Sequence, residues 1–400
     1  MVINLCNHDL FLREMILLDT RYKVDTSVSD HWLKIQEKVD RMILQLKGKS
    51  PHKAGLEGIY DHRSDDWWTS GFWPGILWIM HDLTGKDHYR QEAWQWDERF
   101  EQCMVRESNL HHDVGFQFLP TAVIKHTITE DADGRRRGLQ AASFLAGRYN
   151  IAGNFIRAWN PLSDKELWNY HNVGWAIIDS MMNLSLLFWA ASEIRDPRFS
   201  HIAKAHADTV LKHFIREDGS VCHIVSFDPE TGQFIETIGG QGYGPHSAWS
   251  RGAAWALYGM ANTYRYTQEE RYLEAARRVA NFFIASLEED GIPLWDFRVE
   301  NPENEPKDTS AASCAASGLL EIAKLVPQAE SERYELAARR ILETLTENYG
   351  NWNNPQQQGI LREGTGHKPA GENVNVSLIY GDYFYVEAYA KLMGWQHRIF

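Results

Sequence analysis

The chain alternates between two kinds of helical segment along almost its whole length. Amphipathic segments place apolar side chains about every 3.6 residues, as Trp32, Ile35 and Val39 do in the first of them. Each is followed by a segment that is apolar on nearly every side, which is typical of a helix buried in a large protein. The amphipathic segments are 30–49, 88–105, 131–149, 197–215, 269–287 and 332–349, and the apolar ones are 67–85, 118–129, 169–193, 247–267, 309–325 and 378–395.

This order predicts six helical hairpins, with the apolar helices inside and the amphipathic helices outside. We therefore expect an all-α fold, an (α/α)6 barrel, with an N-terminal arm over residues 1–30 and a single barrel domain over residues 31–400. The hairpins resemble one another only weakly, so the pattern is not a strict sequence repeat. Only short strands are expected, near HIVSF and GILRE.

The connections between these segments differ in length. Turns from an inner to an outer helix are short, whereas the loops that return to an inner helix are long. In an alternating barrel, all the long loops then lie on one face, together with the N-termini of the inner helices. Such ends carry free N–H groups and partial positive charge. This face is therefore the expected binding face, and it suits an anionic ligand.

The apolar segment 169–193 carries one carboxylate in its body, Asp179, which we place in the middle of a helix. An ionised Asp among apolar neighbours is costly unless it is paired, hydrogen-bonded or protonated. Trp175 and Asn183 stand one turn away on either side, so we expect Trp175 to desolvate the carboxyl and Asn183 to hydrogen-bond it. A protonated carboxyl is what a general acid needs. A buried Asp that braces a neighbouring helix is an equally good interpretation.

Composition narrows the class of protein. The formal net charge of −13 is spread without long runs of one sign, which argues against nucleic acid and anionic membranes as partners. The four cysteines show no metal-binding spacing, and the N-terminus does not resemble a signal peptide. No segment is long and apolar enough to span a bilayer. We therefore expect a cytoplasmic protein, a monomer or a weak homo-oligomer.

A second carboxylate, Asp113, stands in the sequence HHDVGF at the start of an inner helix. Taken alone, it is more simply an N-cap. His111 and His112 precede it, but two adjacent histidines do not easily chelate one ion from a single loop, and no third ligand stands at useful spacing. We expect no metal and no cofactor.

The glycine-rich stretch 239–255 is the densest in candidate binding groups. Glycines allow close approach of the backbone to a ligand, and Ser247 is a plausible N-cap. Arg251 suits bidentate binding of a carboxylate, with a surface Arg packed on Trp255 as the simpler alternative. Of the 16 tryptophans most are expected in the core. Those at long-loop junctions, Trp67 and Trp159 among them, are candidates to stack on a sugar.

Six motifs in this order are similar to those of the unsaturated glucuronyl hydrolases. They are WWTSGFWPGILW, HHDVGF, the stretch around IID and MMNL, QGYGPHSAWSRGAAWALYG, DTSAASCAASGLLE and SLIYGDYFYVEA, and they cover the chain from about Ser29 to its C-terminus. The resemblance implies an (α/α)6 barrel and a glycosidase that removes a 4,5-unsaturated uronic acid from oligosaccharides made by polysaccharide lyases.

The resemblance also implies a mechanism and its residues. The residue matching Asp179 protonates C4 of the vinyl ether and helps water to add at C5, and the residue matching Asp113 holds sugar hydroxyls and assists. The residues that match the lining of the sugar site are Trp67, Trp159, His223, Gln241, Trp249, Arg251 and Trp255. Arg251 and the helix N-termini are expected to take the substrate carboxylate.

The sequence departs from the family pattern in two places. Ala253 replaces an amide side chain of the common WARGQAW, and the last long loop lacks a serine-rich pattern associated with sulfated substrates, although Lys368 remains. Two alternatives stay open: an unsaturated rhamnogalacturonyl hydrolase of related fold, and a sugar-binding barrel without catalysis. The presence of both Asp113 and Asp179 argues against the second.

Overall fold

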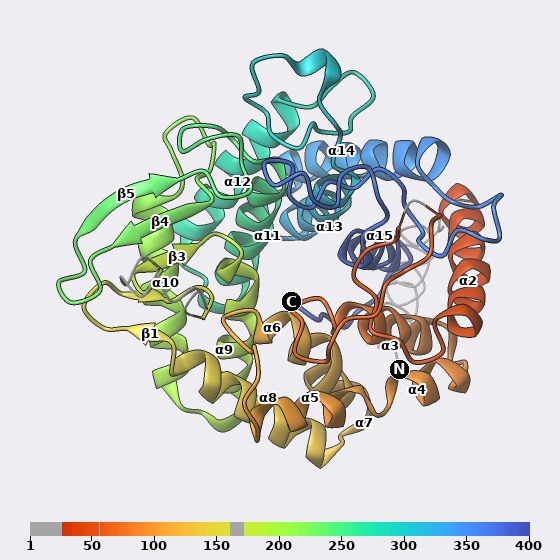
Figure 1. Cartoon of the computed structure of the whole chain (residues 1–400), viewed down its shortest axis with the longest axis horizontal. Helices are drawn as coiled ribbons and strands as arrows, with labels where there is room; N and C mark the ends of the chain where they lie inside the picture. The colour runs from red at the N-terminus through yellow and green to blue at the C-terminus, as the bar shows by residue number, and fades with distance from the viewer. Residues whose placement is uncertain (1–25, 56, 161–171) are drawn as a thin grey trace, which may run out of the picture.

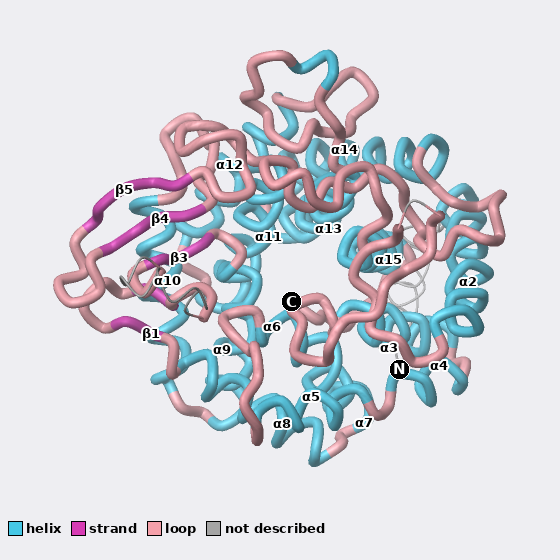
Figure 2. The backbone as a smooth tube through the Cα atoms, in the orientation of Figure 1, coloured by secondary structure: helices cyan, strands magenta, loops and turns pink. Residues whose placement is uncertain are grey.

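The computed structural model describes residues 26–55, 57–160 and 172–400, and helices dominate it (Figures 1 and 2). The outer helices are α2 (Thr26–Leu46), α4 (Asp87–Ala93) with α5 (Trp96–Met104), α8 (Ala132–Ala146), α10 (Pro197–His213), α12 (Glu270–Ala285) and α14 (Gln328–Asn348). The inner helices are α3 (Phe72–Thr84), α6 (Val114–Phe118) continued by η1 (Leu119–Val123) and α7 (Ile124–Thr129), α9 (Ser180–Ile194), α11 (Ser250–Thr267), α13 (Thr309–Leu325) and α15 (Ile379–Leu392).

The inner helices form a closed ring. Contacts run from α3 to η1, from α6 to α9, and then through α11, α13 and α15 back to α3. Figure 1 shows this ring face on, with the outer helices around it. The (α/α)6 barrel predicted from the alternating pattern is confirmed. The arm predicted over residues 1–30 lies mostly outside the described residues, and α2 already begins at Thr26.

Burial explains why the two kinds of helix alternate. In α13 every residue from Thr309 to Ala323 is buried, and its many small side chains let it approach both neighbouring helices closely. In α12 only a stripe that includes Tyr272, Val279 and Phe283 is buried. None of the described helices is both long enough and apolar enough to cross a membrane.

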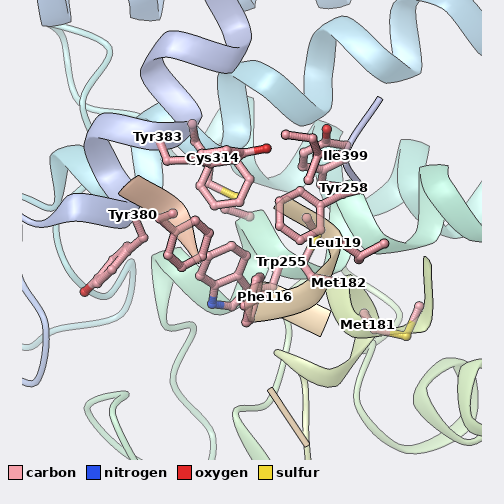
Figure 3. Packing of buried hydrophobic residues seen from close by; sticks show 14 of the residues in the cluster. Phe116, Leu119, Met181, Met182, Trp255, Tyr258, Cys314, Tyr380, Tyr383 and Ile399 are labelled. Carbon is pink, nitrogen blue, oxygen red and sulfur yellow. The ribbon is translucent and has the colours of Figure 1, made fainter. Parts of the chain in front are cut away.

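Aromatic side chains fill the centre of the ring (Figure 3). Trp255 of α11 packs between Phe116 of α6 and Phe384 of α15, with ring centroids 5.3 and 5.4 Å apart. Phe400 packs on Phe116 and Phe384 at 5.6 and 5.7 Å. Since Phe116 stands in the first turn of α6, this aromatic layer supports the ends of the inner helices that carry the candidate site.

A small antiparallel sheet lies beside the ring, on the left in Figure 2. Its strands are β3 (Trp175–Ile177), β4 (Ile224–Phe227) and β5 (Phe234–Ile238), in that order, and a separate hairpin joins β1 (Tyr149–Asn150) to β2 (Phe155–Ile156). Strand β4 confirms the strand expected at HIVSF. At GILRE there is only an isolated bridge, between Gly350 and Leu361.

Strand β3 corrects the prediction of one helix from residue 169 onward. Trp175 pairs with Ser226 and Ile177 with Ile224 of β4, so the main chain before Asp179 is extended. Gly174 also lies so close to the carbonyl group of Phe227 that a side chain there would clash with it. Pairing with a distant strand therefore overrides the helical periodicity of this segment.

Candidate active site

Asp179 lies at the start of an inner helix, not in its middle. Helix α9 begins at Ser180, which makes Asp179 its capping residue, yet the carboxyl makes no capping hydrogen bond. Residues 169–171 of the predicted helix lie outside the described residues. Because Trp175 is in a strand, it does not share a helix face with Asp179 as expected. The carboxyl is therefore not used in holding the helix end.

The carboxyl group of Asp179 is largely enclosed, and one of its two oxygens has no hydrogen-bond donor among the described residues. Its side chain is 14% exposed, and Oδ1 is buried without a partner among the described residues. Nε2 of His223 lies 3.8 Å from this oxygen. Burial raises the pKa of Asp179 to about 7, against the opposing effect of the Arg251 cation. Asp179 can therefore carry a proton near neutral pH, as a general acid must.

His223 is held in one tautomer beside this carboxyl. Its Nδ1 accepts a hydrogen bond of 2.8 Å from the main-chain N–H of Gln241, so in the neutral ring the proton is on Nε2. Burial lowers the pKa of His223 to about 3, which keeps the ring neutral. Gly240, with φ +57°, brings the main chain so close that a side chain there would clash with Nδ1. His223 thus presents an N–H toward Asp179.

Asp113 occupies the corresponding position at the start of α6. It also makes no capping bond, so the simple N-cap interpretation does not describe it. Its Oδ1 accepts a hydrogen bond of 3.0 Å from Asn183 Nδ2 and lies 3.3 Å from His112 Nε2. The amide of Asn183, expected on Asp179, reaches only the main-chain oxygen of that residue, at 3.3 Å.

The two carboxyls titrate as a coupled pair. Burial raises the pKa of Asp113 well above its ordinary value, and the nearby charge of Asp179 raises it further. The hydrogen bond from Asn183 acts in the opposite direction. Burial and the charge of Asp179 thus favour the protonated form of Asp113, while the amide of Asn183 favours its charged form.

His111, His112 and Asp113 bring possible metal-ligand atoms within 4.8 Å of one another. The two imidazole rings stack with an angle of 23° between their planes, and their Nδ1 atoms are 3.1 Å apart. Lone pairs in nearly parallel ring planes do not converge on one ion. The cluster is better suited to hold Asp113 than to chelate a metal.

Arg251 is buried and not, as in the simpler alternative, a surface residue. It is 2% exposed, and its Nη1 donates to Asp308 Oδ2 at 2.5 Å and to the Thr365 carbonyl at 2.6 Å. Nη2 donates to Gln241 Oε1 and to the Gly366 carbonyl, each at 2.6 Å. The terminal nitrogens are thus occupied by the protein itself. In this arrangement Arg251 orders the loops of the binding face and supplies positive charge, without a free fork for a carboxylate.

The predicted tryptophans take three different places. Trp159 is half-buried, with its ring 5.9 Å from that of His112 and 6.1 Å from that of His223, so it forms a wall beside both carboxyls. Trp249 is 2% exposed and packs on His223 at 4.4 Å, behind the site. Trp255 lies in the aromatic layer of the core (Figure 3). Trp67 is half-buried, and its carbonyl accepts a hydrogen bond from Gln117 of α6.

Several residues that shape the site were not predicted as site residues. Asp308 pairs with Arg251. Its position at the start of the small-residue helix, in DTSAASC, was the feature of the sequence that could have marked it as a site residue. Arg148 donates to the carbonyls of Ala158 and Trp159 at 2.6 and 2.7 Å and so fixes the loop that carries Trp159; nothing in its local sequence indicates this. Ser247 does not cap α11, which begins at Ser250; its hydroxyl donates to Asp296.

Comparison with known proteins agrees with this geometry. The model of Glycosyl Hydrolase Family 88 matches residues 35–400. The chain is 35% identical to the unsaturated glucuronyl hydrolase of Bacillus sp. (strain GL1) over 88% of this chain and 93% of that protein, and 32% identical to the unsaturated chondroitin disaccharide hydrolase of Streptococcus pneumoniae over 88% and 90%.

Solved structures give the same result. The crystal structure of the Bacillus sp. GL1 enzyme superposes with a TM-score of 0.87 at 34% identity, covering 91% of this chain and 96% of that one. An unsaturated glucuronyl hydrolase specific for heparin superposes with a TM-score of 0.81 at 30% identity, covering 90% and 97%. The chain belongs to glycosyl hydrolase family 88. It is a glycosidase with a helical barrel.

Proposed function

We propose that this enzyme removes a 4,5-unsaturated glucuronic acid from the non-reducing end of lyase-generated oligosaccharides, by adding water across the C4=C5 double bond. The observation that carries the proposal is the largely enclosed carboxyl of Asp179, whose Oδ1 has no donor within the described part of the chain and whose pKa burial raises to about 7. A vinyl ether is a weak carbon base, so its protonation needs a carboxyl that still holds its proton at neutral pH.

In the first step, the Asp179 proton goes to C4, and the electron pair of the double bond forms the new C–H bond. The positive charge that develops at C5 and the ring oxygen is stabilised by carboxylates nearby, which are Asp179 after its proton has left and Asp113. The N–H of His223, directed at Asp179, then stabilises the anion that this step creates. No change in the oxidation state of any protein group is needed.

In the second step, a water molecule adds at C5 and returns a proton to Asp179, which acts as general base. The product is a hemiketal at C5. The hemiketal opens when the bond between C5 and the ring oxygen breaks, which leaves a ketone at C5 and a hydroxyl on C1. C1 is then a hemiacetal carbon, and it becomes an aldehyde as the glycosidic bond breaks and the second sugar leaves with a proton. The net reaction consumes one water and regenerates the proton on Asp179. Asp113 is assigned to hold the sugar hydroxyls and to orient the water.

The remaining predicted residues bind substrate or prepare the site. Trp159 and Trp67 are assigned to the sugar-binding wall, because both are half-buried beside the inner-helix ends. Gln241 and Arg251 fix the glycine-rich loop, and Trp249 and Trp255 support it from behind. The substrate carboxylate is assigned to the N–H groups of the inner-helix N-termini in the positive field of Arg251.

The class of substrate is supported by the relatives. These relatives are unsaturated glucuronyl or chondroitin disaccharide hydrolases, and the crystal structure of one further relative, from Streptococcus agalactiae, is a complex with dGlcA-GalNAc6S. Disaccharides derived from glycosaminoglycans are therefore the first substrates to test. A cytoplasmic location and a monomeric or weakly oligomeric state are part of this proposal. The free thiols of Cys103, Cys222 and Cys314 support the cytoplasmic location.

The experiment supplies lyase-made disaccharides from chondroitin, hyaluronan, heparin, gellan and pectin and follows the near-ultraviolet absorbance of the double bond. We expect the absorbance to fall while the second sugar is released. Cleavage of the pectin product alone would replace the proposal with a rhamnogalacturonyl hydrolase activity. Constant absorbance on all of them contradicts it.

A further inference from the structure

One buried amide connects the carboxyl of Asp113 to the main-chain carbonyl of Asp179. Asn183 lies in the first turn of α9 and is fully buried. Its Nδ2 donates to Asp113 Oδ1 at 3.0 Å and to the Asp179 carbonyl at 3.3 Å, while its Oδ1 accepts from the main-chain N–H of Phe116 at 3.0 Å. All polar atoms of this side chain are used.

These bonds fix the orientation of the amide. The N–H of Phe116 can only face an oxygen, so Oδ1 must point to α6 and the two N–H groups must point to Asp113 and Asp179. Gly115 makes this possible, because a side chain at that position would clash with Oδ1 of Asn183. The amide cannot turn to offer its oxygen to the Asp113 carboxyl.

The result is an asymmetry between the carboxyls. Asp113 Oδ1 receives a fixed N–H donor, which stabilises a carboxylate. Asp179 Oδ1 receives none within hydrogen-bond distance among the described residues. We propose that Asn183 is a positioning residue that, by holding its amide N–H on Asp113, favours the carboxylate form there against burial and the charge of Asp179, and so favours the proton on Asp179. The proposal rests on the proposed function, in which Asp179 is the acid.

Among the described residues, the other titratable groups that act on the pair do not change protonation between about pH 5 and pH 9. Burial lowers the pKa of His111 and of His223 to about 3 and lowers that of His112 well below its usual value, so these rings stay neutral. Arg148 and Arg251 stay charged, since even the lowered pKa of Arg148 is about 10. A pH effect in this range therefore reports on the carboxyl pair.

The test is Asn183→Leu, which keeps the size of the side chain and removes the donor. We expect kcat to fall by about tenfold or more, because the proton moves to Asp113, and the basic limb of the pH–rate profile to rise by about half a pH unit or more. KM is expected to change much less than kcat. The matched control is Asn262→Leu, a buried Asn on inner helix α11 that contacts Arg265, and its basic limb should not move.

A second readout does not depend on turnover. Carbon-13 NMR of the carboxyl carbons, assigned with Asp113→Asn and Asp179→Asn, should show Asp113 losing its proton at a higher pH in Asn183→Leu than in the wild type. An unmoved basic limb and unchanged carboxyl titrations in folded Asn183→Leu overturn the proposal. If Asn183→Leu does not fold, Gly115→Ala is used in its place, because the added side chain displaces the Asn183 amide. The results expected from Gly115→Ala, and the results that would overturn the proposal, are the same as for Asn183→Leu.

Failure of the proposed function gives a different pattern. If the wild type cleaves no unsaturated disaccharide, the function is wrong. The carboxyl titrations of wild type and Asn183→Leu still decide whether Asn183 assigns the proton.

Discussion

Two of the regions in which the barrel buries carboxyl groups have different surroundings. On the face of the long loops, Oδ1 of Asp179 has no donor among the described residues, and burial raises the pKa of this carboxyl to about 7. Farther along the inner helices, Glu321 of α13 is fully buried but has cations around it. Burial opposes its charge, yet Lys391, Arg265 and Arg398 outweigh this effect and lower the pKa of Glu321 to about 2.

The comparison shows that burial alone does not make an acid. Both carboxyls are largely removed from water, and their pKa values differ because different groups surround them. Glu321 receives Arg265 at 2.9 Å and Arg398 at 3.1 Å, so it is an anion that holds helices together. Among the described residues, Asp179 has a neutral histidine at 3.8 Å and the more distant charge of Arg251, and burial outweighs them, so the carboxyl retains its proton up to about pH 7.

The largest effect is expected from Asp179→Asn. The amide has the same shape but no proton to donate to carbon, so we expect kcat to fall by about a thousandfold or more while the substrate dissociation constant changes by less than about threefold. Steady-state turnover and calorimetric binding measure the two. Near-normal turnover in this variant would show that another group is the acid.

Glu321→Gln should lower the stability of the enzyme and leave its turnover unchanged, whereas Asp179→Asn is expected to nearly abolish turnover. Removing one partner leaves buried cations uncompensated, so the free energy of unfolding should fall by about 3–5 kcal/mol, while kcat of the folded enzyme stays unchanged. Denaturant unfolding measures this, with the exposed Glu347→Gln as the control. Since the pKa of Glu321 is lowered on folding, the stability it contributes is present above about pH 4.5 and is lost as the pH falls toward 2. An unchanged stability at pH 7 would contradict the role given to this group.

The pH dependence of rate and stability should also distinguish Asp179 from Glu321. Above about pH 7 the rate should fall by about tenfold per pH unit as Asp179 loses its proton. The pKa of Asp179 is raised on folding, so its contribution to stability is present at acid pH and is lost as the pH rises through 7. The Tm of Asp179→Asn relative to the wild type should therefore increase from pH 5 to pH 8. A pH-independent difference in Tm would show that Asp179 is ionised throughout.

The smallest effect is expected at the wall of the site. Trp159→Ala removes a half-buried ring beside His112 and His223, so KM should rise by about three- to tenfold with kcat changed less. Trp94→Ala, on the outer helix surface, is the matched control and should leave both constants unchanged. Equal behaviour of the two variants would remove Trp159 from the sugar-binding wall.

The fold could be predicted because periodicity is local. The alternation of amphipathic and apolar segments is enough to define inner and outer helices, and loop length is enough to define the working face. The start of α9 could not be predicted, because residues 175–177 become a strand only when β4 pairs with them. The local sequence favours a helix at residues 175–177, but pairing with the distant strand β4 makes them a strand.

The site residues could be collected from motifs, but their contacts could not. Asn183 stands one turn from Asp179, yet its amide bonds the carboxyl of Asp113, 70 residues away. Arg251 looked free to bind a carboxylate, but Thr365 and Gly366 come from a loop more than a hundred residues further along the chain. Helix spacing gives neighbours within an element, whereas these bonds connect different elements.

The most direct measurement of the central claim is the reaction of an unsaturated disaccharide in D2O, with the position of deuterium in the product read by NMR. If Asp179 protonates the double bond, its exchangeable proton is replaced by deuterium from solvent, and the product carries deuterium at C4 and no double bond. A product that keeps its C4=C5 double bond and carries no deuterium at C4 would mean direct displacement at the anomeric carbon, and it would contradict the account.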